Sequence, residues 1–310
     1  MSLLNSRYFN TVQIDGNGLI VKKSMNEEKL KNEINWYLKL PDSLHHFIPT
    51  IDSYSKKSGN VFVKMENVPF PTLSEVLIRG DFSKNEWEQT FCLINDLLES
   101  FSFFKGSLSS DSINEMYINK TYNRLSSFIN SSEWAKKINK KGYFTFNGTK
   151  LECPLRMIQR YKVDIKTIVS NPKINLLHGD LCFSNILVDI KSKKIKIIDP
   201  RGSFGDTGIY GDQYYDLAKI RHSVSGYDFI ISENYNLTYS EHEVDLDIFR
   251  SPLQQWLGQY WDSLIGNQVH VIKVIEALLY LSMLPLHQDS EHRQIAFYGF
   301  GSYLLNKALT

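Results

Sequence analysis

The sequence has little that would place it among secreted, nucleic-acid-binding or membrane proteins. Its 310 residues include only three cysteines, Cys92, Cys153 and Cys182, an odd number without metal-ligand or redox spacing. The formal net charge is +1, too small to attract a nucleic acid or an anionic membrane. The first residues show no basic segment followed by an apolar core, and no apolar run approaches the length of a membrane span. We therefore expect a soluble, cytoplasmic protein whose partner is a small molecule.

One stretch, Ile174–Gly202, carries a pattern typical of phosphoryl transfer. It contains Asp180 directly after His-Gly, Asn185 five residues later, and Asp199 at the end of a strand-like run. Phosphoryl transfer requires one carboxylate that orients the acceptor hydroxyl, and oxygen ligands that hold Mg²⁺ on the phosphates of ATP. We predict Asp180 in the first role and both Asn185 and Asp199 in the second.

The segment between Asn185 and Asp199 explains how these two residues would meet. Two apolar runs, Ile186–Asp189 and Lys194–Ile198, flank the polar turn Ile190–Lys193, which is typical of a β-hairpin. A hairpin returns the chain, so the residues just before and just after it lie close together. The alternative is a chance turn, but His, Gly, Asp and the later Asn would coincide at roughly one position in 10⁵ to 10⁶.

The motif HGDLCFSN followed by IDPRG resembles the aminoglycoside phosphotransferase and choline kinase family, in which His-Gly-Asp stands where protein kinases have His-Arg-Asp. The resemblance is specific in this stretch and diffuse elsewhere. It implies an α+β, two-lobed protein kinase-like fold with a small antiparallel sheet lobe (residues 1–67) and a mainly helical lobe (68–310). The Asp-Phe-Gly, Ala-Pro-Glu and glycine-rich loop motifs of protein kinases are absent, so activation-loop phosphorylation is not expected to control the protein.

The N-terminal region supplies a lysine for the phosphates of the nucleotide. The turn Asp15–Gly18 joins two strands, and the second, Leu19–Lys23, resembles the Val-Ala-Ile-Lys strand of protein kinases. We favour Lys22 as the phosphate ligand. Lys23 stays open as the alternative, because a shift of one residue in register exchanges the two faces of a strand.

The residues after this strand predict a helix and a hinge. Ser24–Glu27 has the pattern of a capping box, and the helix that it opens runs to Leu40 before a proline. Glu33 on this helix is the candidate partner of the phosphate-binding lysine. The family resemblance places the adenine hinge at Glu66 and Val68, where the Glu66 carbonyl would accept a hydrogen bond and the Val68 amide would donate one.

Two cations are candidates for contact with the substrate or a phosphate. Lys120 lies on the predicted helix Ile113–Phe128, where a solvated face is the competing interpretation. Arg201 lies two residues after Asp199, and an ion pair that holds its own loop is an equal alternative. Asp216, in a segment that resembles the family's Asp-Leu-Ala helix start, is expected to cap a helix and brace the catalytic loop.

Three features of the C-terminal region have a plain and a functional interpretation. The hairpin signal at Tyr143–Glu152 is either a surface insertion or a border of the acceptor site. The acidic run Ser240–Phe249 is more simply a solvated segment than a site for a cationic antibiotic. The aromatics Trp256, Tyr260 and Trp261 are more simply core than a cation–π pocket of the choline kinase type.

Together these patterns predict a Mg-ATP-dependent kinase that transfers the γ-phosphate to a hydroxyl of a small molecule. The IDPRG ending and the MYINKTYNRL helix resemble a bacterial branch associated with surface polysaccharide or lipopolysaccharide sugars. We therefore place a sugar or sugar-derived alcohol first, choline or ethanolamine second, and an aminoglycoside third. A kinase-like module that binds nucleotide without catalysis is the alternative from another class.

Overall fold

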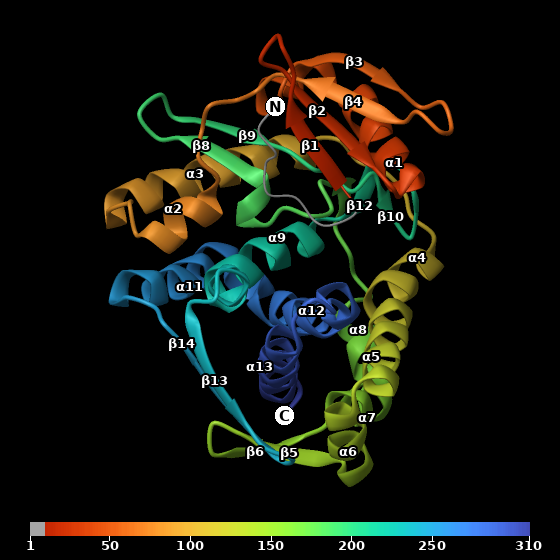
Figure 1. The fold of residues 1–310 in the computed structure, drawn as a ribbon, viewed down its shortest axis with the longest axis vertical. Helices are drawn as coiled ribbons and strands as arrows, with labels where there is room; N and C mark the ends of the chain where they lie inside the picture. Colours follow the sequence, from red (N-terminus) through yellow and green to blue (C-terminus); the bar gives the residue numbers. More distant parts are fainter. Residues whose placement is uncertain (1–9) are drawn as a thin grey trace. The chain divides into compact units, whose positions relative to one another are not determined.

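The polypeptide follows a mixed α+β course, shown in Figure 1 for the computed structural model, which describes residues 10–310. The chain divides into two compact units. Unit 1 contains the described residues up to 107 together with 174–216, and unit 2 contains 108–173 together with 217–310. The lobe boundary predicted at residue 67 was placed at the nucleotide hinge, and it stays a prediction.

The first sheet of unit 1 is organised around the turn at Asp15. Its Oδ1 atom accepts the backbone N–H groups of Asn17 and Leu19, and Gly18 provides the left-handed φ of +79° that closes the turn. The four strands are antiparallel in the order β1-β2-β4-β3. Their bounds are β1 (Asn10–Ile14), β2 (Ile20–Ser24), β3 (Ile51–Ser55) and β4 (Phe62–Met65).

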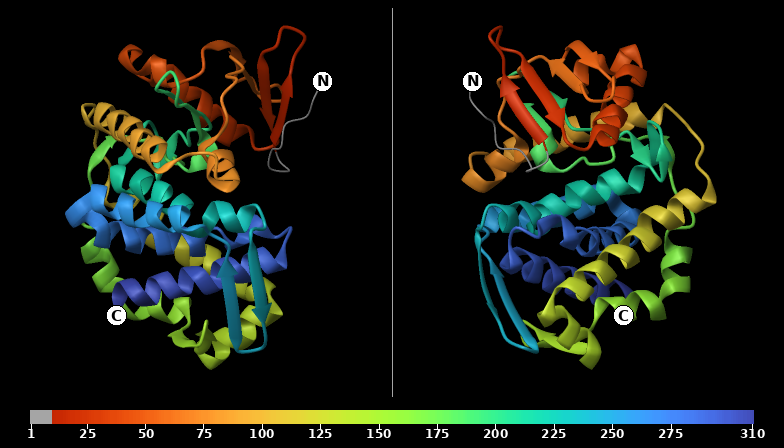
Figure 2. Two further views of the ribbon diagram at one scale, coloured as in Figure 1. Left: turned by 90° about the vertical axis from the view of Figure 1, so that its left-hand side faces the viewer. Right: turned by 45° about the vertical axis from the view of Figure 1, so that its right-hand side comes forward.

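Helix α1 (Glu27–Lys39) follows β2 and packs beside this sheet (Figures 1 and 2). Its N-cap is Asn26, whose side chain accepts the N–H of Lys29 at 3.1 Å. The predicted capping box at Ser24 was therefore wrong, because Asn26 is an equally good cap and lies directly before two acidic residues that suit the helix dipole. The helix ends before Pro41, as predicted.

The remaining helices of unit 1 follow their sequence signals. The pattern of Thr or Ser followed three residues later by Glu predicts a capping box at Thr72 and at Ser83, and the structure has both. They open α2 (Leu73–Arg79) and α3 (Lys84–Ser102), and a short 3₁₀ helix, η1 (Asp42–Phe47), precedes β3.

The segment that carries the predicted catalytic motif folds as a series of short elements within unit 1. The predicted hairpin is confirmed, with Ile186 opposite Ile197 in the pairing of β8 with β9. The segment 201–208 contains three glycines, a composition typical of a loop, but it forms two short paired strands. The elements are β7 (Ile174–Leu176), η3 (Phe183–Asn185), β8 (Ile186–Asp189), β9 (Lys194–Ile197), β10 (Ser203–Phe204), β11 (Asp206–Thr207) and β12 (Tyr210–Asp212).

Unit 2 contains a second sheet, in the order β13-β14-β5-β6. Asn147 and Gly148 have φ values of 45° and 74°, which confirms the hairpin predicted there. The acidic run is not an irregular segment: its acidic side chains alternate with buried Val244 and Leu246 along β14. The strands are β5 (Tyr143–Phe146), β6 (Thr149–Glu152), β13 (Tyr235–Tyr239) and β14 (Glu243–Ile248), and Figure 2 shows β13 and β14 side by side.

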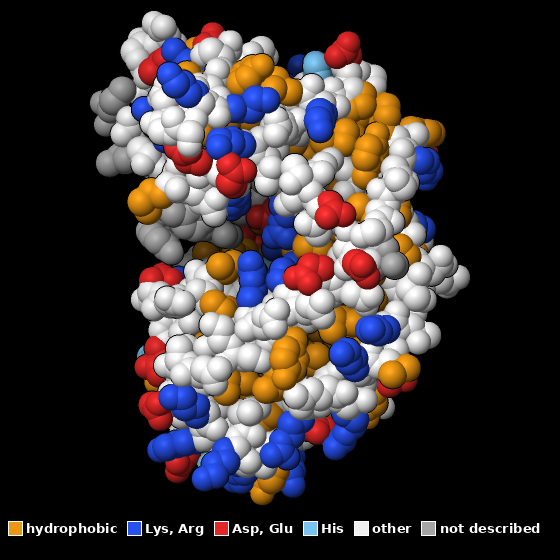
Figure 3. All heavy atoms as spheres, turned by 90° about the vertical axis from the view of Figure 1, so that its right-hand side faces the viewer, with side chains coloured by type: hydrophobic (Ala, Val, Ile, Leu, Met, Phe, Trp, Pro, Cys, Tyr) orange, Lys and Arg blue, Asp and Glu red, His pale blue; other side chains and the backbone are white. Residues whose placement is uncertain are grey.

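The helices of the first half of unit 2 are broken in two places. The helix predicted over Ile113–Phe128 is α4 (Ser110–Asn114), a π-helical turn η2 (Glu115–Asn119) and α5 (Lys120–Ser131). A proline favours the first turn of a helix, so Pro154 predicts a helix from there to about residue 170; the structure interrupts it at Tyr161. Helix α6 lies between these two interrupted helices in sequence. Its exposed lysines gather at one end of the surface in Figure 3. These other helices are α6 (Glu133–Lys141), α7 (Pro154–Arg160) and α8 (Lys162–Ile168).

The last helices of the chain hold much of the core of unit 2. Trp261, Tyr280 and Phe297 are fully buried, as expected for Trp261. Residues Pro252–Ser282 form the one helical stretch of the described chain that is long and apolar enough to cross a membrane, although no such run was expected. Core helices of soluble proteins pass the same test, and 56% of its most apolar window is buried. The helices are α9 (Gln213–His222), η4 (Ser223–Tyr227), α10 (Asp228–Ile231), α11 (Pro252–Ile265), η5 (Gly266–Gln268), α12 (Val269–Ser282), η6 (Leu284–His287) and α13 (Glu291–Leu309).

Candidate functional site

A buried lysine joins two carboxylates in unit 1. The Nζ atom of Lys22 lies 2.7 and 2.9 Å from the two carboxylate oxygens of Glu33 and 2.7 Å from Oδ1 of Asp199. Lys22 and Glu33 are almost completely buried, whereas the side chain of Asp199 is 44% exposed. Lys23, the alternative from the sequence, is exposed on the other face of β2. The structure therefore brings together three residues that are predicted to serve one site.

The charges of these three side chains depend on one another. Burial disfavours the ammonium of Lys22, but the carboxylates of Asp199 and Glu33 outweigh it and raise the lysine pKa. Burial, with a smaller contribution from Asp199, raises the pKa of Glu33 to about 7 despite the nearby ammonium. Partial desolvation by the surrounding protein opposes ionisation of the half-exposed Asp199, yet Lys22 lowers its pKa. Asp199 thus stays ionised at neutral pH.

The loop after β7 presents Asp180 beside Asn185. The Nδ2 atom of Asn185 donates to the backbone carbonyl of Asp180 at 2.8 Å, which leaves its Oδ1 atom as the available acceptor. The Asn185 carbonyl accepts the N–H of Ile198 at 3.0 Å, one step beyond the last pair of the β8–β9 hairpin. The hairpin therefore brings Asn185 next to the residue before Asp199, as the sequence predicted.

His178 is a neutral structural residue of this loop. Its ring is fully buried, Nε2 lies 2.9 Å from the carbonyl of Ile198, and Nδ1 accepts the N–H of Asp180 at 3.2 Å. These contacts assign the proton to Nε2. Burial lowers the pKa of His178 to about 4, so the ring is uncharged at neutral pH.

Asp216 stabilises the same loop by binding backbone N–H groups of the loop. Its carboxylate accepts the N–H groups of His178 and Gly179 at 2.8 and 2.9 Å. The bracing role is the one expected, but the capping role was wrong, because α9 begins at Gln213 and the Asp212 side chain accepts the N–H of Tyr214. Burial raises the pKa of Asp216 to about 7, against the effect of these hydrogen bonds.

Position 179 requires glycine because of its backbone conformation and a neighbouring side chain. Its φ is +80°, and a Cβ atom there would lie 2.8 Å from the Cβ of Arg201. Arg201 in turn donates its backbone N–H to the carbonyl of His178, and its guanidinium lies 5.3 Å from the centre of the Tyr215 ring. This contact engages the Arg201 head group within unit 1, in keeping with the loop-holding interpretation of that residue.

Two aromatic side chains of α1 also belong to the site, and the sequence analysis missed both roles. Trp36 donates its indole N–H to the carbonyl of Leu177 at 2.7 Å, and the hydroxyl of Tyr37 accepts the N–H of Asp199 at 3.2 Å. A usable signal was present, since Trp36 and Tyr37 lie three and four residues after Glu33 and therefore share its helix face. One face of α1 thus contacts the lysine, the predicted catalytic loop and the predicted metal ligand.

The predicted hinge lies at the end of β4. The N–H of Glu66 donates to the Thr50 carbonyl, and its side chain accepts the N–H of Thr50 at 3.0 Å. Within residues 10–310, the Glu66 carbonyl and the Val68 amide make no hydrogen bond to the protein. Two backbone groups of the polarity that an adenine edge requires are therefore available there.

Lys120 lies in unit 2, at the start of α5, apart in sequence from the unit 1 residues described above. Its Nζ atom lies 3.9 Å from the sulfur of Met116. The neighbouring Arg124 donates to the carbonyl of Ser282 at 3.1 Å. In the described part of the chain, no group of three or more His, Cys, Asp or Glu side chains could hold a metal ion alone.

The comparisons with known proteins identify a fold. No protein-family model matches the sequence, and no curated protein matches it. Among solved structures, the aminoglycoside phosphotransferase APH(4)-Ia with AMP-PNP and hygromycin B aligns over 99% of this chain and 93% of its own, with 10% identity and a TM-score of 0.60. APH(2")-IIa with streptomycin and ATP aligns over 97% and 90%, with 14% identity and a TM-score of 0.57. A putative fructosamine-3-kinase from Haemophilus somnus aligns over 100% and 90%, with 12% identity and a TM-score of 0.55. The chain therefore has the protein kinase-like fold of the aminoglycoside phosphotransferases.

Proposed function

We propose that the chain is a Mg-ATP-dependent kinase that transfers the γ-phosphoryl group to a hydroxyl of a small molecule. The contact of Lys22 with both Glu33 and Asp199 carries this proposal. Desolvating an ammonium and a carboxylate is expensive, so such a buried cluster is weak evidence for stability alone. It is well suited to hold a lysine ready for nucleotide phosphates beside a metal-binding carboxylate.

The residues fit Mg²⁺ held on ATP. Mg²⁺ takes oxygen ligands and binds through one or two protein groups together with substrate phosphates. Asn185 offers Oδ1, since its Nδ2 is engaged, and Asp199 offers Oδ2, since Oδ1 contacts Lys22. The bound ion would neutralise charge that develops on the transferred phosphoryl group.

The side chains divide the remaining work. Asp180 orients the acceptor hydroxyl and accepts its proton, and Lys22 positions the phosphates while Glu33 keeps it in place. Neutral His178 fixes the loop through its bonds to Ile198 and Asp180. Because most of the chemistry is positioning, these fixed contacts matter more than the basicity of any one group.

We propose the adenine hinge at Glu66–Val68, which makes residues 1–67 the nucleotide lobe and 68–310 the catalytic and acceptor lobe. The free Glu66 carbonyl and Val68 amide support it. The test is a comparison of ATP with GTP and with an adenine analogue that lacks the amino group. A hinge that reads this edge should bind the analogue less tightly than ATP.

For the acceptor, we propose a sugar or a sugar-derived alcohol, ahead of choline, ethanolamine or an aminoglycoside. Hygromycin B, kanamycin and streptomycin, which are bound in structures of similar fold, are hydroxyl-rich and support a hydroxyl group as the acceptor. A panel of hydroxylated metabolites with Mg-ATP, read by the mass gain of one phosphate, tests the order.

The decisive experiment on the reaction compares Asp180→Asn with Asp164→Asn, an exposed aspartate of α8. Asp180→Asn should abolish phosphoryl transfer, including slow transfer to water, while Mg-ATP still binds. Asp164→Asn should behave as wild type. Wild-type protein that binds Mg-ATP without any turnover would instead favour a nucleotide-binding module, and retained turnover in Asp180→Asn would refute the catalytic role.

A further inference from the structure

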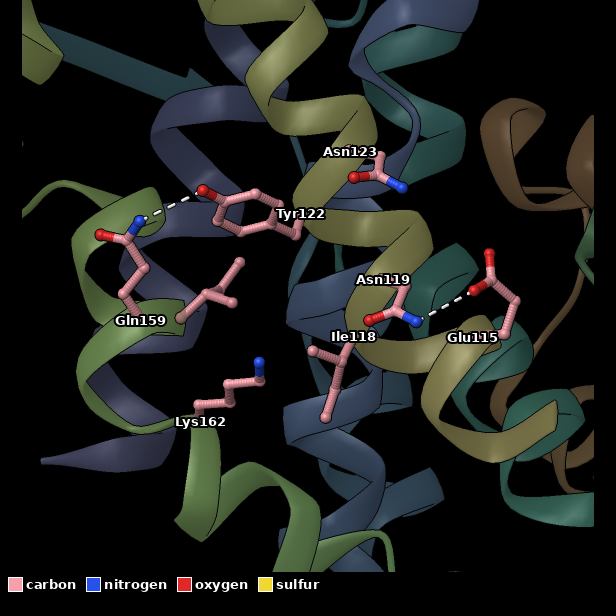
Figure 4. Close-up of a pocket in the computed structure, with 8 residues that line it drawn as sticks. Glu115, Ile118, Asn119, Tyr122, Asn123, Gln159 and Lys162 are labelled. Atoms are coloured by element: carbon pink, nitrogen blue, oxygen red, sulfur yellow. Dashed lines mark hydrogen bonds between the residues drawn. The ribbon is translucent and has the colours of Figure 1, made fainter. Parts of the chain in front are cut away.

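Unit 2 contains a pocket that shares no residue with the site described above. Its volume is about 350 Å³, within the range of roughly 300–1,000 Å³ that is usual for small-molecule sites. One wall comes from the π-helical turn η2 and the start of α5, and the other from the junction of α7 with α8 (Figure 4). The pocket is therefore a candidate for a second ligand.

Both walls are built from interrupted helices. The turn Glu115–Asn119 is π-helical, and such turns inside α-helices recur at functional sites. On the opposite wall the helix breaks at Tyr161, so Gln159 and Lys162 come from two different helices. Regular helices in both places would present other residues to this space.

The pocket combines an apolar base with a polar rim. Ile118 and Ile158 are 3% and 1% exposed, so they form the buried base of the pocket. The rim carries amide, phenol, carboxylate and ammonium groups, supplied by Glu115, Asn119, Tyr122, Asn123, Gln159 and Lys162. The groups that this arrangement offers to a ligand are therefore mainly the hydrogen-bonding groups of the rim.

Hydrogen bonds within the rim fix the orientation of its amides. Asn119 donates to the Glu115 carboxylate at 3.0 Å, and Gln159 donates to the hydroxyl of Tyr122 at 3.2 Å. The amide oxygens of Asn119 and Gln159 are left as acceptors, and Tyr122 keeps its hydroxyl hydrogen as a donor. Lys162 adds an ammonium that has no hydrogen-bond partner among residues 10–310, and it faces Asn119 across the pocket in Figure 4.

These groups select the chemical class of the ligand. One carboxylate and one ammonium give the lining no net charge, so neither an anion nor a cation is favoured. A wholly apolar ligand would desolvate the amides without replacing their hydrogen bonds. Hydroxyl groups donate and accept at once, so they can replace the water that these rim groups would otherwise bind. We propose that this pocket binds a neutral polyhydroxylated ligand, a single sugar ring or a cyclic polyol, as a non-catalytic site.

The proposal goes beyond the kinase function and does not depend on it. A sugar that serves as the phosphate acceptor would have to reach Asp180, whereas this ligand would be held by residues 115–123 and 158–162. A chain without kinase activity could still bind sugar here. The two proposals therefore fail separately.

Ligand-observed saturation-transfer NMR provides the test, with glucose, galactose, N-acetylglucosamine and myo-inositol as probes and glucose 6-phosphate as the charged comparison. The double variant Asn119→Ala/Gln159→Ala removes two acceptors, and Asn130→Ala is the matched control, an exposed asparagine of α5 that does not line the pocket. At least one neutral probe should bind more tightly than glucose 6-phosphate. The double variant should weaken that binding roughly tenfold or more, as expected for two lost hydrogen bonds, and the control should not.

Amide chemical shifts of the protein locate the binding. Shifts confined to residues 115–123 and 158–162, retained in Asp180→Asn, support the pocket. Absence of binding by every probe overturns the proposal. So does binding that the double variant leaves unchanged while its thermal unfolding matches wild type, or binding that is lost only in Asp180→Asn, which would assign the sugar to the catalytic loop.

Discussion

The hydroxyl of Tyr37 accepts the backbone N–H of Asp199 at 3.2 Å. Asp199 has a φ of +60°, a left-handed conformation that is uncommon for residues other than glycine, so its backbone is held by its neighbours. Tyr37 is 3% exposed, and no water competes easily for this bond. The contact therefore ties the geometry of the predicted metal ligand to helix α1.

Tyr37→Phe should loosen Asp199 without removing any predicted ligand. A buried N–H without a partner costs about 1–3 kcal/mol, so hydrogen exchange of peptides covering Asp199 should quicken. The Mg²⁺ concentration required for half-maximal turnover should rise. Tyr303→Phe, which removes a hydroxyl that contacts Lys307 at 2.8 Å, serves as the control. Unchanged exchange around Asp199 would show that the hydroxyl does not position it.

Trp36→Phe should separate positioning from simple stability. Trp36 donates to the Leu177 carbonyl at 2.7 Å, and Trp134 in unit 2 makes an equivalent bond to the Ser240 carbonyl at 2.8 Å. Both Phe variants lose an indole N–H and should lose about 1 kcal/mol in the free energy of unfolding, measured by urea titration. Only Trp36→Phe should lower kcat. Equal kcat values in the two variants would contradict the positioning role.

Gly179→Ala should disrupt the predicted catalytic loop for two reasons. Alanine is strained in the left-handed backbone conformation of this position, and its Cβ would clash with the side chain of Arg201. Gly59 has the same φ, +80°, but open space around it, so Gly59→Ala measures the backbone effect alone. We expect Gly59→Ala to cost about 1 kcal/mol and to keep its activity. Gly179→Ala should lose more stability and at least tenfold in kcat. Similar losses of stability and kcat in both variants would show that the Arg201 side chain can move aside at little cost.

Stability should rise with pH in the acid range because His178 is buried as a neutral ring. Its folded pKa of about 4 lies below the ordinary value of 6.5, so the unfolded chain binds more protons between these values. The free energy of unfolding should increase by up to about 3 kcal/mol from pH 4 to 6.5 through this group. His178→Gln, which keeps a donor for the Ile198 carbonyl, should flatten that rise. A slope equal to that of wild type would mean that other groups cause it.

Local sequence signals predicted the elements that depend on neighbouring residues. The β8–β9 hairpin, the caps at Thr72 and Ser83, and the turn at Asn147 all follow from residues within a few positions of one another. The pairing of Lys22 with Glu33 also followed, because a strand leads directly into the helix.

The remaining features depend on distant residues. Nothing near Tyr37 in sequence indicates that its hydroxyl meets a backbone amide at position 199. The strand β14 was hidden because its exposed face is acidic and strand propensity is low for Asp and Glu. The π-helical turn at Glu115 was not predicted from the apolar spacing of its helix.

The division of the chain into interleaved units has a consequence for its synthesis. Residues 108–173 belong to unit 2 but leave the ribosome before the segment that completes unit 1, which ends at 216. The strand β7 and the loop that follows it must therefore join unit 1 after 66 residues that belong to unit 2 have been made. Until residues 217–310 are made, the early helices of unit 2 lack their late partners and expose apolar surface, so slow translation should make this chain dependent on chaperones.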